Sequence, residues 1–474
     1  MAGPDYSTLI NNFTLDVLKG GIMGYDDLDV ALFQTLSGFS KVDEFHGDTV
    51  EQIMRTTRPY TSEAMIERKD MPEGKSWAYL RTQLRNTQFM TNSELTIEDM
   101  QRARGGSDSW GDIVMEALQL QIDDREHFMK LASIGDGTGR LGKIKADNAT
   151  GVTEDTNVFT VILSNTYDNF GWDNCWLLSV GMKVDIRDAS GDALGAACNG
   201  LEITSVTQGT RSLSGHAAVD GSFTFTSTTD LIGSGGLLEN PSGFLVYMAG
   251  SAGKIATSEL TADTTTVMTG LTGIVTDNVI FGSGNHAYFQ GRARASFPAL
   301  KAQVTRLNSG TPTTWDGTTI STAIRSLTTG ITRVKPSDLV IMCNGQIAMA
   351  MHNMNISSTG GAGAYQVSVP TGNAAFQAVT GSRYSEVFIA PDGTPIPIVI
   401  DDTIPPHYMF ILHKPSFTLY KNYWGFVNDY GTGIWQPKRM SRALIYEAPW
   451  RGYVQLGVDR CDGCAVISDL RYDL

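Results

Sequence analysis

The longest amphipathic pattern in the chain lies between Ser107 and Ile134. Apolar residues recur there at the spacing of one helix face, with two polar positions in the same stripe. The stripe consists of Ile113, Val114, Ala117, Leu118, Gln121, Arg125, Phe128 and Leu131. At about 1.5 Å per residue, the pattern predicts a helix of roughly 40 Å, more than twice the usual length.

The predicted helix has a start signal and a stop signal. Asp108 or Ser109 can accept hydrogen bonds from the free amide groups of the first turn. Gly135 is expected to adopt the left-handed conformation that ends the helix, and Gly137 and Gly139 should prevent its continuation. We therefore expect a single straight element with a sharp end.

A polar hairpin is predicted before this helix. Its strands are Thr61–Lys69 and Lys75–Arg85, and Met71–Gly74 between them has the composition of a turn. Neither strand has a strong apolar face, and an isolated two-stranded hairpin is only marginally stable in water. The hairpin either packs on its own domain or projects and is ordered by a neighbour. Residues 1–54 are interpreted as an arm that needs a partner surface, although Tyr25–Leu36 could form a short helix.

Short alternating segments dominate residues 150–258. The predicted strands are Val158–Leu163, Met182–Arg187, Leu201–Val206, Ser222–Ser227 and Phe244–Met248. Strands at roughly ten-residue spacing indicate a small barrel or a sandwich. Because the block lies between elements that look like parts of one domain, we interpret it as an insertion.

A second helix is predicted at Thr318–Val334, with Thr318 or Thr319 as its cap. Its apolar face consists of Ile320, Ala323, Ile324, Leu327 and Ile331. A short helix is predicted at Gly345–Met354, and the Gly- and Ser-rich residues 357–385 are expected to form a mobile loop. Further strands are predicted at Asp338–Cys343, Pro395–Asp401, Tyr408–Leu412, Phe417–Tyr420, Tyr453–Gly457 and Ala465–Ser468.

Size and charge narrow the class of protein. The chain has 474 residues and a formal net charge of −14. A protein that grips phosphate backbones needs clustered Lys and Arg, so this charge argues against such a function. An acidic protein can, however, line a DNA-filled space without adhering to it. The odd count of 5 cysteines gives no disulfide framework and favours a reducing compartment. Neither a signal peptide nor a membrane-spanning apolar run is indicated.

The patterns that suggest reactive sites are incomplete. Gly250–Lys254 is similar to a phosphate-binding loop, but Met248 and Ile255 stand where that loop requires a glycine and a hydroxyl. The glycine cluster at 135–139 ends a helix, whereas pyrophosphate binds where a helix begins. Cys461–Cys464 has the spacing of half a zinc site without a matching second pair, so we interpret it as a turn with two thiols. We therefore predict no enzyme activity, no catalytic or metal site and no cofactor.

The order of these elements resembles the major capsid protein of tailed bacteriophages, the Hong Kong 97-type fold. Short motifs carry the resemblance together with that order, which covers residues 55–474. The motifs are Gly135–Leu141, Gly181–Ile186, Leu271–Thr276, Val340–Asn344 and Ile396–Pro405. The resemblance implies an α+β fold with an N-terminal arm, an extended hairpin loop, a long spine helix, peripheral and axial domains, and an inserted all-β domain that the plainest members lack.

The resemblance also implies a division of the chain. The expected parts are the arm (1–54), the extended hairpin loop (55–106), the spine helix and start of the peripheral domain (107–149), the inserted β domain (150–258), the peripheral domain (259–317), the axial domain (318–415) and the return strands of the peripheral domain (416–474). The hairpin loop would lie across a neighbouring subunit. Its expected inter-subunit contact residues are Arg68, Lys69, Glu73, Lys75 and Trp77.

The implied function is self-assembly, through hexamers and pentamers, into the icosahedral shell around the DNA of a tailed phage. Residues 1–54 are too short for a scaffolding segment, so a separate scaffold protein is expected, together with a portal; a decoration protein is left open. The packaged double-stranded DNA would be enclosed without sequence-specific binding, and no membrane is involved. The expected location is the virion capsid, assembled in the bacterial cytoplasm. The alternatives are a phage tail or surface-binding β-rich structural protein and, third, an enzyme with a site hidden in residues 150–258.

Overall fold

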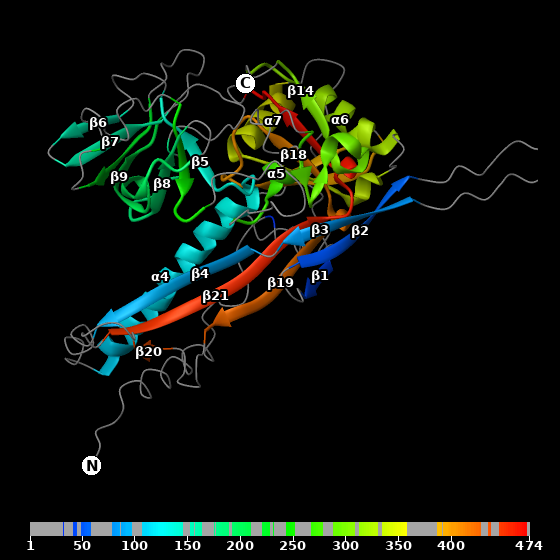
Figure 1. Ribbon diagram of the computed structural model, residues 1–474. Helices are drawn as coiled ribbons and strands as arrows, with labels where there is room; N and C mark the ends of the chain where they lie inside the picture. The colour runs from blue at the N-terminus through cyan, green and yellow to red at the C-terminus, as the bar shows by residue number, and fades with distance from the viewer. Residues whose placement is uncertain are drawn as a thin grey trace, which may run out of the picture.

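A computed structural model gives the three-dimensional structure (Figure 1). The residues that it describes are 32, 41–44, 49–57, 78–85, 87–96, 107–145, 152–155, 157–163, 175, 177–188, 192–209, 220–227, 231, 243–251, 267–277, 288–308, 312–329, 334–357, 386–390, 392–427, 435–437 and 445–471.

The predicted long helix is α4 (Ser107–Ile134), and it runs along a five-stranded sheet (Figure 1). β4 pairs with one edge of the long strand β21, β19 and β20 pair with its other edge, and β1 adds to β19 in parallel. The strands of this sheet are β1 (Lys41–Glu44), β4 (Thr87–Thr96), β19 (Phe417–Phe426), β20 (Gln436–Pro437) and β21 (Ile445–Val458).

The apolar stripe of α4 is confirmed, because all eight of its residues are buried or half-buried. Its two polar members have specific partners in the sheet. The Gln121 amide donates to Thr91 Oγ1 at 3.1 Å and to the Ala448 carbonyl at 3.0 Å. The Arg125 guanidinium lies 4.8 Å from the centre of the Trp450 ring. These contacts explain why the stripe holds polar residues without a loss of packing.

Two details of the α4 ends differ from the sequence prediction. The helix begins at Ser107, so Asp108 and Ser109 lie inside its first turn. Gly135 is not left-handed: its amide still donates to the Leu131 carbonyl at 2.9 Å, as in a helix. The left-handed residues are Gly137, with φ of 89°, and Gly139, with φ of 79°. The chain therefore turns away two residues later than predicted, at Gly137 instead of Gly135.

A seven-stranded sheet follows α4 and confirms the expected β-rich block. Its order is β5-β11-β8-β9-β10-β7-β6. A bridge between Ile144 and Leu163 joins the β5 end to β7 and closes the sheet into a small barrel, one of the two predicted forms. Phe159 and Phe225 stack inside it, with ring centres 5.2 Å apart. The strands are β5 (Arg140–Lys143), β6 (Val152–Asp155), β7 (Val158–Ile162), β8 (Lys183–Arg187), β9 (Leu201–Thr207), β10 (Ser222–Thr226) and β11 (Leu245–Met248).

The third region is a six-stranded mixed sheet with two helices. Its order is β14-β22-β18-β15-β17-β16, in which the pairs β14–β22 and β15–β17 are parallel. The elements are α6 (Gly317–Thr329), α7 (Gly345–Ser357), β14 (Gln303–Arg306), β15 (Leu339–Cys343), β16 (Glu386–Ile389), β17 (Pro395–Ile400), β18 (Met409–His413) and β22 (Ala465–Ser468).

The cap of α6 differs from the prediction. Asp316, not Thr318 or Thr319, accepts the Thr319 amide at 3.1 Å and the Thr318 hydroxyl at 2.6 Å. These bonds hold the pKa of Asp316 below its usual value, with the Thr318 bond the larger cause. The apolar face is confirmed at its described positions, which are Ile320, Ala323, Ile324 and Leu327.

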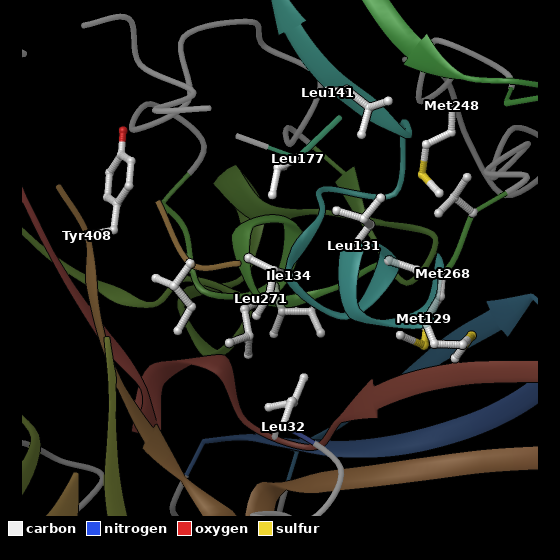
Figure 2. Close-up of a cluster of buried hydrophobic side chains, with 14 of the residues drawn as sticks. Leu32, Met129, Leu131, Ile134, Leu141, Leu177, Met248, Met268, Leu271 and Tyr408 are labelled. Atoms are coloured by element: carbon white, nitrogen blue, oxygen red, sulfur yellow. The ribbon is translucent and has the colours of Figure 1, made fainter. Parts of the chain in front are cut away.

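The regions share one core where α4 ends (Figure 2). Leu131 and Ile134 of α4 meet Leu271 of α5 (Leu271–Ile274), Leu141 of β5 and Tyr408 there. Gly270 donates its amide to the Gly135 carbonyl at 2.9 Å, and Thr272 Oγ1 donates to the Ile134 carbonyl at 2.8 Å. The end of the long helix is thus closed by α5 and the residue before it, and not by glycine conformation alone.

Several sequence predictions fall outside the described residues. Of Tyr25–Leu36 only Leu32 is described; it is helical and buried. The strand Thr61–Lys69 and all but the first residue of the loop at 357–385 also lie outside. Among the described helices, none is long and apolar enough to cross a membrane.

Candidate interaction surfaces

A two-stranded hairpin forms a sheet of its own at one side of the molecule (Figure 1). β2 (Thr49–Thr57) pairs antiparallel with β3 (Ala78–Arg85). The hairpin therefore starts before residue 55, because its first strand is β2. The inward side chains are buried; they are Gln52, Met54, Leu80, Thr82 and Leu84. The outward side chains Glu51, Ile53, Tyr79 and Arg81 are exposed.

The base of this hairpin is clamped to the body by a tight turn. β12 (Tyr288–Phe289) and β13 (Arg292–Ala293) are joined by Gln290 and Gly291, whose φ values are 50° and 71°. Two successive left-handed residues are typical of the turns that connect two-residue hairpins. The Gln290 carbonyl accepts the Gln83 amide at 3.0 Å, and Arg292 Nε donates to the Arg81 carbonyl at 3.0 Å. The direction in which the hairpin leaves the body is fixed by these bonds.

The outer face of the hairpin is partly apolar. Ile53 is 60% exposed and Tyr79 is 58% exposed. They are diagonal neighbours, since Ile53 lies opposite Arg81, two positions along β3 from Tyr79. Arg81 and Glu51 form an exposed ion pair at 3.9 Å. Two large exposed apolar side chains beside a charged pair are the composition of a protein contact surface.

The predicted contact residues are not among the described ones. Arg68, Lys69, Glu73, Lys75 and Trp77 all lie between β2 and β3, in residues 58–77, so their contact role stays a prediction. Sequence reasoning missed Ile53, Tyr79 and the turn that clamps Gln83. Residues 50–54 do not alternate between apolar and polar side chains, so the sequence carried no period-two signal for the first of these.

A cleft of about 670 Å³ is the second surface. It lies between α4, β4 and the loops of the barrel that flank β8 and β11. Its lining residues are Gln88, Phe89, Met90, Asp124, His127, Phe128, Leu131, Gly181, Met182, Lys183, Met248, Ala249, Gly250, Ser251 and Val267. Apolar and polar groups share the wall about equally: three methionines contribute to the apolar part, and Asp124, His127 and Lys183 supply polar and charged groups.

Two buried polar atoms in the cleft wall lack a hydrogen-bond partner. They are His127 Nε2 and Ser251 Oγ. Burial lowers the pKa of His127, although Asp124 opposes this shift. Burial also raises the pKa of Asp124, against the influence of His127. The imidazole therefore favours its neutral form, in which a ring nitrogen can accept a hydrogen bond from an incoming donor.

The other reactive groups in the described part of the chain, the cysteines, are buried and pack in the protein core. All five cysteines are free and buried. Cys461 begins the short helical turn η8 (Cys461–Gly463) and Cys464 follows it, so the two thiols flank a turn between β21 and β22, as predicted. Burial raises the pKa of Cys461 to about 12, beside the buried guanidinium of Arg294. Arg294 itself donates to backbone carbonyls, among them Ile274 at 3.2 Å and Thr276 at 3.1 Å. No cluster of potential metal ligands occurs in the described ranges.

Comparison with known proteins gives structural similarities only. No family model matches the chain, and no curated protein matches it. Among solved structures, the cyanophage A-1(L) capsid asymmetric unit is similar at 11% identity, with 95% of both chains covered and a TM-score of 0.42. The capsid of the native GTA particle follows at 8% identity, with 92% of this chain and 90% of that chain covered and a TM-score of 0.42. The SrpI encapsulin of Synechococcus elongatus PCC 7942 is similar at 7% identity, with coverage of 97% and 96% and a TM-score of 0.41.

The order of elements along the chain is the one that the sequence predicted. The elements occur in the expected order: hairpin, long helix, β-rich block, helix–strand–helix and returning strands. Of the last strands, β19 and β21 rejoin the sheet under the long helix, where β21 pairs with β4 and β19 pairs with β1. The final strand β22 does not: it pairs with β14 and β18 in the six-stranded sheet, so the expected return of all of residues 416–474 to one sheet is wrong for β22. The fold is thus a mixed α/β fold of this layout.

Proposed function

We propose that this chain is a shell subunit, the major capsid protein of a tailed bacteriophage, with a structural and not a catalytic role. The hairpin is the observation that carries the proposal. Its base is bonded to the body, while its outer face presents Ile53 and Tyr79 to solvent. A clamped element with an exposed apolar face is suited to contact another copy of the same chain.

The parts of the fold support specific roles in such a shell. We assign α4 and the five-stranded sheet to the peripheral domain, and the six-stranded sheet with α6 and α7 to the axial domain at the centre of hexamers and pentamers. The barrel of β5–β11 is assigned to an inserted domain. The hairpin would be the extended loop that crosses a neighbour, with Arg68, Lys69, Glu73, Lys75 and Trp77 at the contact. Shell subunits bury large interfaces, and obligate interfaces exceed about 2,000 Å².

The net charge is compatible with a shell that encloses DNA. The chain carries 36 Lys and Arg against 50 Asp and Glu. An acidic inner wall would not bind packaged double-stranded DNA tightly, because release of counterions needs clustered basic residues. A scaffold protein and a portal are the further partners that this role implies.

Electron microscopy of the full chain, expressed with its scaffold protein, tests the proposal. Closed shells of uniform diameter are the expected result. Folded monomers or amorphous material alone would count against a shell subunit. Shells that form without a scaffold and enclose a protein cargo instead of DNA would favour a protein-storage shell over a phage capsid.

A further inference from the structure

Seven large apolar side chains are exposed among the described residues. Ile53 and Tyr79 lie on the outer face of the β2–β3 hairpin, and Met90 is part of the cleft wall. Leu120 and Val180 are close in sequence to residues that line the cleft, since Leu120 is one helical turn before Asp124 and Val180 precedes Gly181. Val158 and Met349 lie elsewhere, on β7 and α7. The hairpin face and the cleft therefore each hold exposed apolar side chains.

We propose that the cleft between α4, β4 and the barrel receives the Ile53–Tyr79 face of the hairpin from a neighbouring copy. This inference rests on the proposed function and gives the barrel a role in assembly, because the barrel supplies Met182, Lys183 and Met248 to the receiving wall.

The cleft runs along one edge of β4, and this shape suits a strand from a neighbouring copy. Gln88, Phe89 and Met90 are consecutive residues of β4, and all three line the cleft. Successive side chains of a strand point to opposite faces, so a hollow that touches three in a row lies along the strand's edge. Within the described residues β4 pairs with β21 alone, and this leaves that edge open. Methionine side chains adapt their shape, and Met90, Met182 and Met248 can close around Ile53 and Tyr79.

The polar groups of the two surfaces are complementary. The cleft contributes the carboxylate of Asp124, and the hairpin face contributes the guanidinium of Arg81. His127 Nε2 and Ser251 Oγ are buried without partners in the isolated chain, where each unsatisfied atom is unfavourable. Both atoms are inaccessible in the isolated chain, so the charges of Arg81 and Asp124 carry the complementarity between the two surfaces.

A chain cannot fill its own cleft with its own hairpin. Gln290 and Arg292 hold the hairpin at one side of the molecule, and the barrel lies at the other side (Figure 1). The cleft is lined by residues of α4, β4 and the barrel. The hairpin face and the cleft are two different surfaces of the same chain. When the hairpin face of one copy contacts the cleft of the next copy, the contact is head-to-tail. Such contacts form closed rings when the rotation between copies closes, as hexamers and pentamers require.

Charge reversal in the full-length chain tests this pairing. Arg81→Glu and Asp124→Lys should each lower the yield of assembled shells by roughly tenfold, since like charges would meet across the interface. Combining both substitutions should restore most of the yield. Light scattering or sedimentation measures the assembled fraction, and unchanged thermal unfolding of the subunits shows that each variant folds.

Two further variants separate the barrel's role from a general loss of assembly. Met182→Glu, in the barrel wall of the cleft, should also reduce assembly, whereas Val158→Glu, at an exposed apolar position of β7 away from the cleft, should not. If the unmodified chain forms shells while the Arg81, Asp124 and Met182 variants assemble normally, the cleft is not the receiving site but the shell function stands. If the unmodified chain forms no shells with its scaffold, the proposed function itself is wrong.

Discussion

Burial determines the chemistry of individual residues in this chain. Cys461 and Cys464 were predicted to form a turn and not half a zinc site, and both thiols are buried beside the last strands. Burial raises the pKa of both, and that of Cys198 rises to about 11 for the same reason. A thiol reacts through its thiolate, so these groups are doubly protected, by low acidity and by lack of access.

We expect none of the cysteines to react with a thiol reagent at neutral pH in the folded protein. All 5 should react once the chain is unfolded in denaturant. Absorbance of the released chromophore, measured with and without denaturant, counts the reactive thiols. Rapid labelling of even one cysteine in the native protein would show that a region described here as packed opens readily.

The spacing of apolar residues predicted which helices form, and which face they bury, more accurately than it predicted where the helices begin and end. The faces of α4 and α6 follow directly from periodicity, which is a local property. The end of α4 does not, because the Gly135 carbonyl is satisfied by Gly270, a residue far along the chain. Asp316 was missed as the cap of α6 because Asp and Thr side chains can both cap a helix. Only the start of the helix at Gly317 shows that Asp316, and not Thr318 or Thr319, stands at the capping position.

Gly270 is the residue at which the end of α4 can be tested. A Cβ atom there would lie 2.2 Å from the Ser133 carbonyl oxygen and 2.4 Å from that of Ala132. Gly270→Ala should therefore lower the free energy of unfolding by at least about 3 kcal/mol, since backbone would have to move. Denaturant unfolding of the unassembled subunit measures the change.

Gly463→Ala is the matched control for this prediction. Its Cβ would meet no atom closer than 3.4 Å, and its φ lies outside the left-handed range. We expect a change within about 1 kcal/mol. Equal effects of the two substitutions would show that the contact between Gly270 and the end of α4 does not stabilise the fold.

At the scale of the whole molecule, the order of regions was predictable and the pairing between distant strands was not. The barrel lies in one continuous segment, and its pattern is complete within it, whereas the six-stranded sheet takes its strand β22 from residues 465–468. In contrast, β4 pairs with residues 445–454, and β1 pairs with Thr418–Lys421. Part of the chain before residue 106 therefore belongs to the molecule's own sheet. Among the described elements, the hairpin extends beyond that sheet, and its strand β2 was missed because residues 49–57 have no continuous apolar run. The predicted strand Thr61–Lys69 lies outside the described residues.

The hairpin therefore separates folding from assembly. Deleting Arg68–Ser76 removes its predicted contact segment and leaves β2, β3 and the bonds to Gln290 and Arg292 intact. We expect a folded subunit with unchanged thermal unfolding that forms no shells, because the buried core of the chain is not touched. Sedimentation of the protein expressed with its scaffold measures the assembled fraction.

A second variant shows whether the chemistry of this segment matters or only its length. Replacing Arg68, Lys69, Glu73, Lys75 and Trp77 by serine keeps the length and removes the predicted contacts. If that variant fails to assemble as the deletion does, these side chains make contacts between subunits. If it assembles normally while the deletion does not, the segment acts as a spacer, and the contact energy comes from the described face that holds Ile53 and Tyr79. If the deletion variant forms shells in normal yield, neither the side chains nor the length of the segment Arg68–Ser76 is needed for assembly.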